Sequence, residues 1–321
     1  MATVSVIIAC YNRAEYVGAA IESALAQTHP PHEIIVVDDQ STDGSVDVVS
    51  RYPVRLLHAP EKLYAAGARN LAASVATGEL IAILDSDDLW LPSHLEHAVA
   101  HFATSPDVAL TFSGTEIMGG PRDGEYLAPR VPDGPPAAML ASALREVPGY
   151  HATVVMRREA FDAVGRYREA GPTIWAEDYD LFLRLAVRYR FAATHEVTVR
   201  YRVHGGQLST QPWRQNVSAY AARALLHAGL GATDPELQAF VRHECIATWQ
   251  RDLVTAWQAL DVDGMRATWT LREWLPAPPR LTLLAAWGFM WGATGVRAAV
   301  RSVRSVRPKR RGLREGVLAT S

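Results

Sequence analysis

Cysteine is scarce in this 321-residue chain, which contains only Cys10 and Cys245. Two cysteines cannot form the disulfide framework of a small secreted domain, so they favour a reducing compartment, and we expect Cys10 to serve packing at the end of an apolar strand. The chain also lacks internal repeats and low-complexity tracts, which excludes solenoid architectures. Because the first apolar strand begins at Val4, we expect no secretory signal and a cytoplasmic location.

The chain has an uncharged segment near its C-terminal end, but this segment lacks the length to span a membrane. Residues 281–296 are uncharged but fall short of the roughly 20 residues that a spanning helix needs. Trp287, Trp291 and a following cluster of eight cationic residues that ends at Arg314 suit a peripheral helix on anionic lipid, at the inner face of the plasma membrane. The alternative is a buried terminal helix with a disordered basic tail. Nothing else indicates nucleic-acid binding.

The spacing of apolar and polar residues divides the chain into three parts. Residues 1–210 alternate apolar strands with amphipathic helices, and residues 211–275 show helical spacing alone. Residues 276–321 start at a proline-rich break and contain the uncharged segment and the basic tail. We expect the helices of 211–275 to pack on the first part or on a second subunit of a homodimer.

Apolar segments at residues 4–9, 33–37 and 80–84 predict buried strands. Strands without polar alternation are typical of parallel sheets that are covered on both faces. An amphipathic helix follows the first strand, with Asn12 as its expected N-cap. The sequence therefore predicts an α/β fold, with a Rossmann-like, mostly parallel sheet flanked by helices and a helical C-terminal extension.

Acidic residues stand where two of these strands end. Asp39 follows the second strand, and Asp85 and Asp87 follow the strand at 80–84. The carboxyl ends of parallel strands meet at one rim, where a hard divalent cation such as Mg²⁺ or Mn²⁺ would keep close carboxylates ionised. Turns and helix caps also favour Asp, which is the alternative explanation. We expect Asp88 to begin the next helix.

Two later positions also have the chemistry of a site. Asp178 lies in the first turn of an amphipathic helix, where the helix dipole alone already favours acids. His204 follows the strand at 197–203, and an imidazole can serve as a metal ligand or as a hydrogen-bond donor.

Taken together, these segments resemble the inverting family 2 glycosyltransferases, which have a nucleotide-sugar-binding GT-A fold. No single segment is decisive, because short motifs match by chance. The resemblance rests on five segments in the family's order and spacing: VSVIIACYNR at 4–13, IIVVDDQSTDGS at 34–45, GARNLAASVATGELIAILDSDDLWLP at 67–92, AEDYDLFLRL at 176–185 and YRVHGGQLS at 201–209.

The resemblance implies a role for each candidate residue. On the donor side, Ala9, Tyr11 and Asp39 would form the nucleobase pocket. Lys62 and Arg69 lie near the same rim by their place in the sequence, and either cation could meet the diphosphate or stay a solvated surface charge. The motif formed by Asp85 and Asp87 is of the DxD type, and its acids would bind Mn²⁺ or Mg²⁺, joined by His204 from the far side of the cleft. Asp178 would be the general base. Trp90 would line the sugar site or pack in the core.

The resemblance thus implies a metal-dependent hexosyltransferase that acts in cell-surface polysaccharide synthesis. It would move a sugar from a UDP- or dTDP-hexose donor to a hydroxyl of a glycan or lipid-linked acceptor, with inversion. Transfer to a polyprenyl phosphate is an alternative that Asp178 disfavours, because an anionic acceptor needs little base catalysis. A non-catalytic nucleotide-sugar-binding scaffold is an alternative of another class. A nucleotidyltransferase is disfavoured because CYNRAEY, at residues 10–16, has no phosphate-binding glycine.

Overall fold

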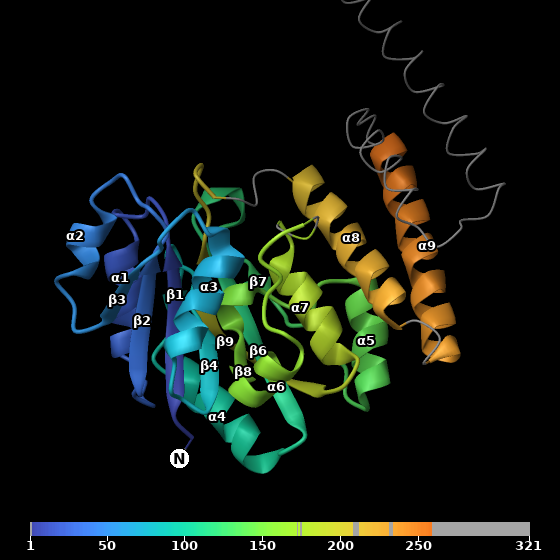
Figure 1. The fold of residues 1–321 in the computed structure, drawn as a ribbon, viewed down its shortest axis with the longest axis horizontal. Helices are drawn as coiled ribbons and strands as arrows, with labels where there is room; N and C mark the ends of the chain where they lie inside the picture. The colour runs from blue at the N-terminus through green and yellow to red at the C-terminus, as the bar shows by residue number, and fades with distance from the viewer. Residues whose placement is uncertain (1, 172, 174, 208–211, 231–233, 259–321) are drawn as a thin grey trace, which may run out of the picture.

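The computed structural model describes residues 2–171, 173, 175–207, 212–230 and 234–258. Within these residues a single nine-stranded sheet has the order β3-β2-β1-β4-β8-β6-β9-β5, and β7 pairs with β6 (Figure 1). The strands are β1 Val4–Cys10, β2 Glu33–Asp38, β3 Arg55–His58, β4 Leu80–Ile83, β5 Leu89–Trp90, β6 Val108–Met118, β7 Tyr126–Leu127, β8 Val155–Arg157 and β9 Arg190–Arg202.

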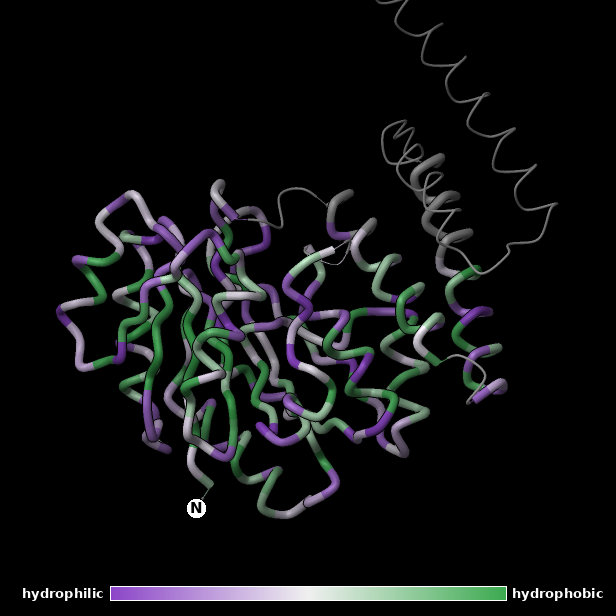
Figure 2. The backbone as a smooth tube through the Cα atoms, in the orientation of Figure 1, coloured by the Kyte–Doolittle hydropathy of each residue, from purple (hydrophilic) through white to green (hydrophobic). Residues whose placement is uncertain are grey.

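Strands β1 to β4 form the parallel half of the sheet. Strand β1 pairs in parallel with β2 and β4, and β2 pairs in parallel with β3. β1, β2 and β4 are buried almost throughout, and Figure 2 shows them as hydrophobic segments below hydrophilic loops. This part of the sequence prediction is confirmed, because unbroken apolar runs need cover on both faces.

The other half of the sheet mixes directions but keeps one functional rim. Strand β8 is antiparallel to both β4 and β6, so β6 runs in the direction of β4. Strand β9 pairs in parallel with β6 over almost its whole length. The carboxyl end of β9 therefore lies at the same rim as those of β1, β2 and β4, although β9 comes far later in the chain.

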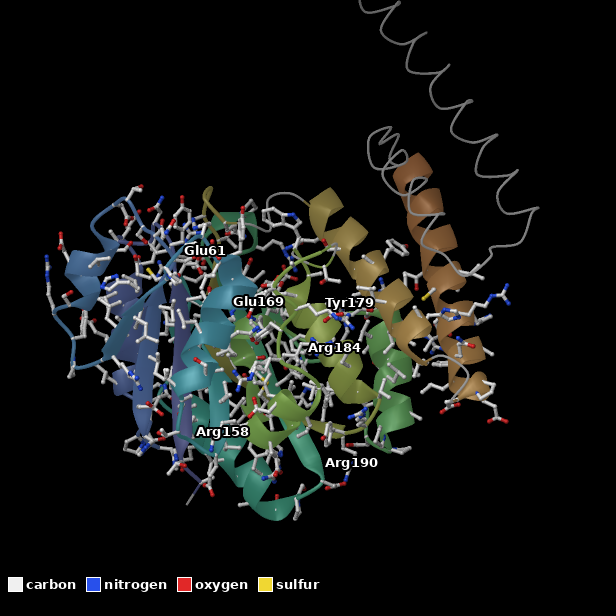
Figure 3. The ribbon with its side chains drawn as sticks, in the orientation of Figure 1. Glu61, Arg158, Glu169, Tyr179, Arg184 and Arg190 are labelled. Carbon is white, nitrogen blue, oxygen red and sulfur yellow. The ribbon has the colours of Figure 1, made fainter. Side chains whose placement is uncertain are left out.

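Helices cover both faces of the sheet and give two apolar cores. One core contains side chains of α3, α5, α6 and α7, and the other contains side chains of α1, α2 and α4. Glu61 lies at the upper rim in Figure 3, and Arg158 and Arg190 lie toward the opposite end. The helices of the sheet layer are α1 Val17–Leu25, α2 Ser45–Val49, α3 Tyr64–Val75, α4 His94–Thr104, α5 Pro136–Arg145, α6 Arg158–Ala163 and α7 Glu177–Ala186, with short 3₁₀ turns η1 Gly120–Arg122 and η2 His151–Thr153.

Three local predictions need correction or resolution. Asn12 does not cap α1: the N-cap is Tyr16, and Asn12 adopts a positive φ of 50° while its side-chain oxygen accepts the backbone N–H of Thr42. Asp88 does not begin a helix, because strand β5 follows it and α4 begins at His94. Trp90 belongs to the core, since it is 4% exposed and its indole N–H donates to the Ala152 carbonyl.

Two helices extend the α/β layer at its right side in Figure 1. Helix α8, Pro212–Leu230, packs on α7, and α9, Pro235–Gln258, packs on α8 and α5. Arg223 donates to the Leu144 carbonyl and Arg145 pairs with Glu244, so polar contacts also join this extension to α5. The three-part division stays a prediction, and residues 276–321 lie outside the described residues. In the described part of the chain, no helix has the length and apolarity that a membrane crossing requires.

Candidate active site

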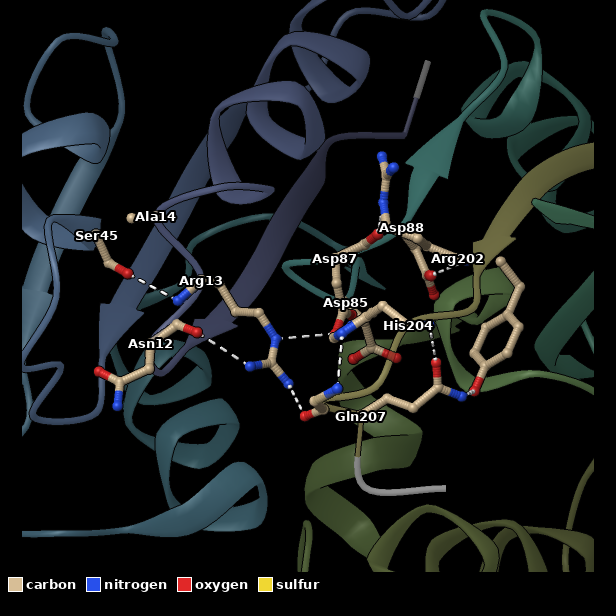
Figure 4. A network of polar contacts seen from close by, with 12 residues as sticks. Asn12, Arg13, Ala14, Ser45, Asp85, Asp87, Asp88, Arg202, His204 and Gln207 are labelled. Atoms are coloured by element: carbon tan, nitrogen blue, oxygen red, sulfur yellow. Dashed lines mark hydrogen bonds and ion pairs between the residues drawn. The ribbon is translucent and has the colours of Figure 1, made fainter. Parts of the chain in front are cut away.

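Asp87 is the centre of a polar network at the common rim (Figure 4). Its Oδ2 accepts a hydrogen bond from Arg13 Nε at 2.9 Å and lies 3.0 Å from His204 Nε2. Arg13 follows β1, Asp87 follows β4 and His204 follows β9, so the network joins the ends of three strands. The side chains of Arg13, Asp87 and His204 are 18%, 19% and 11% exposed. A charged contact at this degree of burial is weakly screened by solvent.

The loop that carries His204 is held by its own hydrogen bonds. The Gly206 N–H donates to His204 Nδ1 at 3.2 Å, which makes Nδ1 an acceptor and leaves the proton on Nε2. Nε2 therefore donates to Asp87 in this structure. Gln207 accepts the backbone N–H of His204 and donates to the Tyr201 hydroxyl, which fixes the loop to β9.

Arg69 joins Asp85 to the first turn of α7. Its Nη2 lies 2.8 Å from Asp85 Oδ1 and its Nη1 lies 2.7 Å from Glu177 Oε1, with only 8% of the arginine side chain exposed. Burial alone would raise the pKa of Asp85, but the Arg69 charge outweighs burial and holds that pKa below its usual range. Asp85 is thus directed to a cation of the protein, and Arg69 connects the DxD segment with the segment of the predicted base.

Asp178 stands in the first turn of α7 beside that ion pair. Burial, and next the charge of Glu177, raise the pKa of Asp178 to about 7. The backbone N–H of Tyr179 donates to Asp178 Oδ1, which works in the opposite direction. Desolvation therefore outweighs the hydrogen bond and the helix dipole. A carboxylate with this pKa is a far better proton acceptor near neutral pH than an ordinary aspartate.

A buried His–Tyr pair lies behind Arg69 and Asp85. His151 Nε2 is 2.8 Å from the Tyr167 hydroxyl, and His151 Nδ1 is 3.9 Å from Asp85 Oδ1. Burial, together with the Arg69 charge, lowers the pKa of His151 to about 3, so its imidazole is neutral. The Arg69 guanidinium also faces the Tyr167 ring at 5.7 Å. The pair therefore lines one side of the Arg69 side chain without adding a charge.

The predicted nucleobase residues gather at the ends of β1 and β2. Asp39 accepts the backbone N–H groups of Leu63 and Tyr64, at 2.7 and 3.0 Å, where α3 begins. Lys62 Nζ lies 3.0 Å from Asp39 Oδ2 and over the face of the Tyr11 ring. Lys62 thus stands with the nucleobase residues rather than with Asp87. Ala9 precedes them on β1, where it pairs with Val37 of β2.

Asp88 ties the DxD turn to β9. Its Oδ1 accepts the backbone N–H of Arg202, and the Arg202 Nε donates to the Asp87 carbonyl, each at 2.8 Å. Burial, followed by the charges of Asp85 and Asp87, raises the pKa of Asp88 well above its usual range. Asp88 therefore holds the DxD turn against the backbone of β9. Cys10, at the end of β1, is buried as predicted, and burial raises the pKa of its thiol to about 12.

This rim offers few donors to a divalent cation. Among the described residues, no group of three or more His, Cys, Asp or Glu side chains is arranged to hold a metal ion. Asp87 Oδ2 and His204 Nε2 are 3.0 Å apart, which is about the separation of neighbouring ligands in an octahedral shell with bonds of about 2.1 Å. Asp85 instead faces Arg69. The protein therefore offers two donors, and phosphate oxygens and water would have to complete the shell.

Sequence reasoning missed three residues of this network, namely Arg13, His151 and Tyr167. A signal existed for Arg13, because it is a cation directly after a strand that ends at the acidic rim. No comparable signal marks His151 or Tyr167, since they come from the turn η2 and the loop after α6 and meet only in the fold.

The comparisons with known proteins agree on one family. A sequence model described as Glycosyl transferase family 2 matches residues 5–165. The UDP-Glc:alpha-D-GlcNAc-diphosphoundecaprenol beta-1,3-glucosyltransferase WfaP of Escherichia coli is 32% identical over 219 residues, which are 67% of this chain and 83% of that protein. The putative teichuronic acid biosynthesis glycosyltransferase TuaG of Bacillus subtilis (strain 168) is 38% identical over 134 residues, 39% of this chain and 53% of its own length.

Solved structures share the fold. S. aureus TarS 1–349 aligns with a TM-score of 0.63 at 18% identity, over 96% of this chain and 93% of that chain, and TarS 1–349 is also known in complex with UDP-GlcNAc. The mannosyltransferase PcManGT from Pyrobaculum calidifontis, in complex with GDP-Man and Mn²⁺, aligns with a TM-score of 0.56 at 21% identity, over 96% of this chain and 81% of that chain. Likeness at these identities shows the architecture alone.

Proposed function

The chain belongs to glycosyl transferase family 2 and has the GT-A fold that its sequence predicts, and from this premise we propose that it transfers a hexose with inversion from a nucleotide-diphosphate donor to a hydroxyl group. A UDP- or dTDP-hexose is the favoured donor, and a glycan or lipid-linked sugar of a surface polysaccharide is the favoured acceptor. The E. coli relative supports this choice, since its name gives UDP-Glc as donor and a diphosphoundecaprenol-linked sugar as acceptor.

The observation that carries the proposal is the environment of Asp178. Its pKa of about 7 leaves a large fraction of the carboxylate ionised at neutral pH while making it a stronger base than a solvated aspartate. Glu177 is engaged by Arg69, so the two neighbouring acids have separate tasks. One base suffices for a direct displacement, because the acceptor oxygen attacks the anomeric carbon and no enzyme nucleophile is needed.

In the proposed reaction Asp178 accepts the proton of the acceptor hydroxyl as that oxygen bonds to the anomeric carbon. Arg69 positions Asp178 indirectly, by fixing Glu177 in the same helical turn and Asp85 at the donor side. Proton transfer then occurs in a partly desolvated setting, where a small misplacement of the base is costly.

The donor would lie along the common rim. Tyr11 and Asp39 would receive the nucleobase, with Ala9 beneath it and Lys62 beside it, because their contacts cluster at the ends of β1 and β2. Asp87 and His204 would hold Mn²⁺ or Mg²⁺ beside the diphosphate, as their separation allows. The cation would neutralise negative charge on the departing nucleoside diphosphate.

A lipid-linked acceptor would place the reaction at the inner face of the plasma membrane. The basic C-terminal segment would then serve as a peripheral contact with anionic lipid, and residues 211–275 could contribute to a homodimer. Vesicle flotation with and without residues 276–321 measures the first of these proposals, and light scattering of the purified chain measures the second.

Donor turnover tests the proposed function directly. Purified protein with Mn²⁺ or Mg²⁺ is offered a panel of nucleotide sugars and lipid-diphosphate-linked acceptors, and release of nucleoside diphosphate is measured. We expect turnover with a UDP- or dTDP-hexose that is lost in Asp87→Asn and Asp178→Asn. The matched control is Asp107→Asn, because Asp107 is an exposed partner of Arg190 at the opposite end of the molecule. Donor binding without turnover for any acceptor would favour the scaffold alternative.

A further inference from the structure

The Arg13 guanidinium connects three chain segments at the rim. Its Nε donates to Asp87 Oδ2 at 2.9 Å, its Nη2 donates to the Gly206 carbonyl at 3.0 Å, and its Nη1 donates to the Asn12 carbonyl at 3.0 Å. Figure 4 shows this side chain reaching from the loop after β1 to the DxD turn. All three guanidinium nitrogens are therefore bound to oxygen, and the cation is the direct counter-charge of Asp87.

The backbone that carries Arg13 is fixed independently of its side chain. Arg13 N–H donates to Ser45 Oγ at 2.8 Å, and the Ala14 N–H donates to Asp43 Oδ2 at 3.0 Å. Asp43 also accepts from the Ser45 backbone, which holds the two loops together. Rotation of the Arg13 side chain therefore needs no rearrangement of the loop.

Two N–H donors occupy the Asp87 oxygen that a cation would use. Oδ2 receives Arg13 Nε and His204 Nε2, at 2.9 and 3.0 Å. His204 can become a ligand in its other tautomer, with the proton on Nδ1, once the Gly206 N–H gives up its bond to that nitrogen. Arg13 has no such option, because a guanidinium stays charged and has no lone pair to offer. A divalent cation bound at Asp87 would therefore stand beside the Arg13 charge, and the two cations would compete for the same carboxylate.

We propose that Arg13 is the resident counter-cation of Asp87 in the donor-free protein, and that loading of a divalent cation and a nucleoside diphosphate moves its guanidinium from Asp87 onto the diphosphate. This inference rests on the proposed function, since that function brings a diphosphate to the rim. The planar fork of an arginine matches phosphate oxygens in pairs, and the exchange keeps the charge balance of the rim before and after loading.

Binding measurements on the full-length protein test two points separately: whether Arg13 opposes Mn²⁺ binding at Asp87, and whether Arg13 supports binding of the nucleoside diphosphate. Mn²⁺ affinity is measured without nucleotide by calorimetry and by the electron paramagnetic resonance signal of free Mn²⁺, and UDP affinity is then measured at saturating Mn²⁺. We expect Arg13→Gln to bind Mn²⁺ about tenfold more tightly without nucleotide, because the competing charge-assisted bond is gone. We expect the same variant to bind UDP about tenfold more weakly, because the diphosphate loses a cation.

Arg200→Gln is the matched control, because Arg200 pairs with Glu116 at the surface of β9 and makes no contact with Asp87. It should leave both affinities unchanged. An Arg13→Gln variant with unchanged or weaker Mn²⁺ binding would overturn the exchange, as would the absence of Mn²⁺ binding in all proteins up to millimolar concentration. Failure of UDP, dTDP and GDP to bind wild type would instead contradict the proposed function, while the nucleotide-free Mn²⁺ arm would still decide the competition at Asp87.

A measurement on wild type covers the case in which Arg13→Gln does not fold. The Nε–H resonance of Arg13 in ¹⁵N-arginine-labelled protein, assigned by its loss in Arg13→Lys, should shift when Mg²⁺ and UDP are added together. A resonance that keeps its donor-free position at saturating Mg²⁺ and UDP would show that Arg13 stays on Asp87, which contradicts the proposal.

Discussion

The two acidic regions of the candidate site, called here the donor wall and the base wall, give their acids opposite environments. On the donor wall, formed by the loops after β1, β2 and β4, carboxylates accept N–H donors or meet cations, as Asp39 does with Leu63 and Lys62. On the base wall, at the start of α7, burial raises the pKa of Asp178 to about 7. The donor wall thus holds its acids against cations and N–H donors, whereas the base wall keeps one acid near the point of protonation. Arg69 joins the two walls.

Asp178→Asn should have the largest effect, because it removes the proposed proton acceptor and leaves the donor wall intact. We expect kcat to fall by roughly 10²- to 10⁴-fold, the usual contribution of general-base catalysis. Calorimetry with the donor's nucleoside diphosphate should show unchanged affinity. Equal losses of kcat and of nucleotide affinity would mean that Asp178 belongs to the donor wall.

Arg69→Met should remove the ion pairs that connect the two walls and should lower the stability of the fold. The substitution leaves Asp85 and Glu177 without their shared buried partner, so the free energy of unfolding should fall by about 3 kcal/mol. Urea denaturation followed by circular dichroism measures this change. Arg69→Lys should recover only part of the loss, because an ammonium lacks the fork that reaches both carboxylates. A loss below about 0.5 kcal/mol would place the pair in the weak class of surface contacts.

A smaller effect is expected in the pH dependence of activity, which should follow the raised pKa of Asp178 on the base wall. Activity should rise with pH through about 7, because the base must lose its proton to act and its pKa lies there. Glu177→Gln should move this rise to lower pH, since the negative charge of Glu177 is one of the causes that raise the pKa of Asp178. kcat/KM measured from pH 5 to 9 tests the direction. An unchanged or upward shift would contradict the assigned environment.

Tyr167→Phe should have the smallest effect, because it deletes one neutral hydrogen bond to His151 and keeps the ring beside Arg69. We expect stability to fall by about 1 kcal/mol, with kcat reduced severalfold at most. Thermal unfolding and initial rates measure both quantities. A loss of activity as large as that of Asp178→Asn would show that the His–Tyr pair takes part in proton transfer.

The sequence predicts those parts of the site that follow from single segments. Apolar runs predict the parallel strands, and the places where they end predict Asp39, Asp85 and Asp87 at one rim, as the structure has them. His204 could be placed there only through the family resemblance, because the direction of β9 depends on its pairing with β6 across the chain.

The remaining features depend on what surrounds a residue rather than on its neighbours in sequence. Asp88 has the acidic neighbours of a ligand, yet the fold buries it against the backbone of Arg202. Asn12 is a good capping residue by type, but the loop after β1 needs a positive φ there. His151 could not be identified because its partner, Tyr167, lies on another element.

The parallel pairing of β6 with β9 also sets an order for biosynthesis. Asp87 and His204 are 117 residues apart in the chain, so the rim is incomplete on the ribosome until β9 has emerged and paired. A nascent chain that ends before β9 contains β1–β4 but has no His204 to pair with Asp87. We therefore expect translation products truncated before residue 190 to bind the nucleoside diphosphate with Mn²⁺ more weakly than the full-length protein, which filter binding would measure. Full affinity for the nucleotide would then be reached only after β9 has been synthesised.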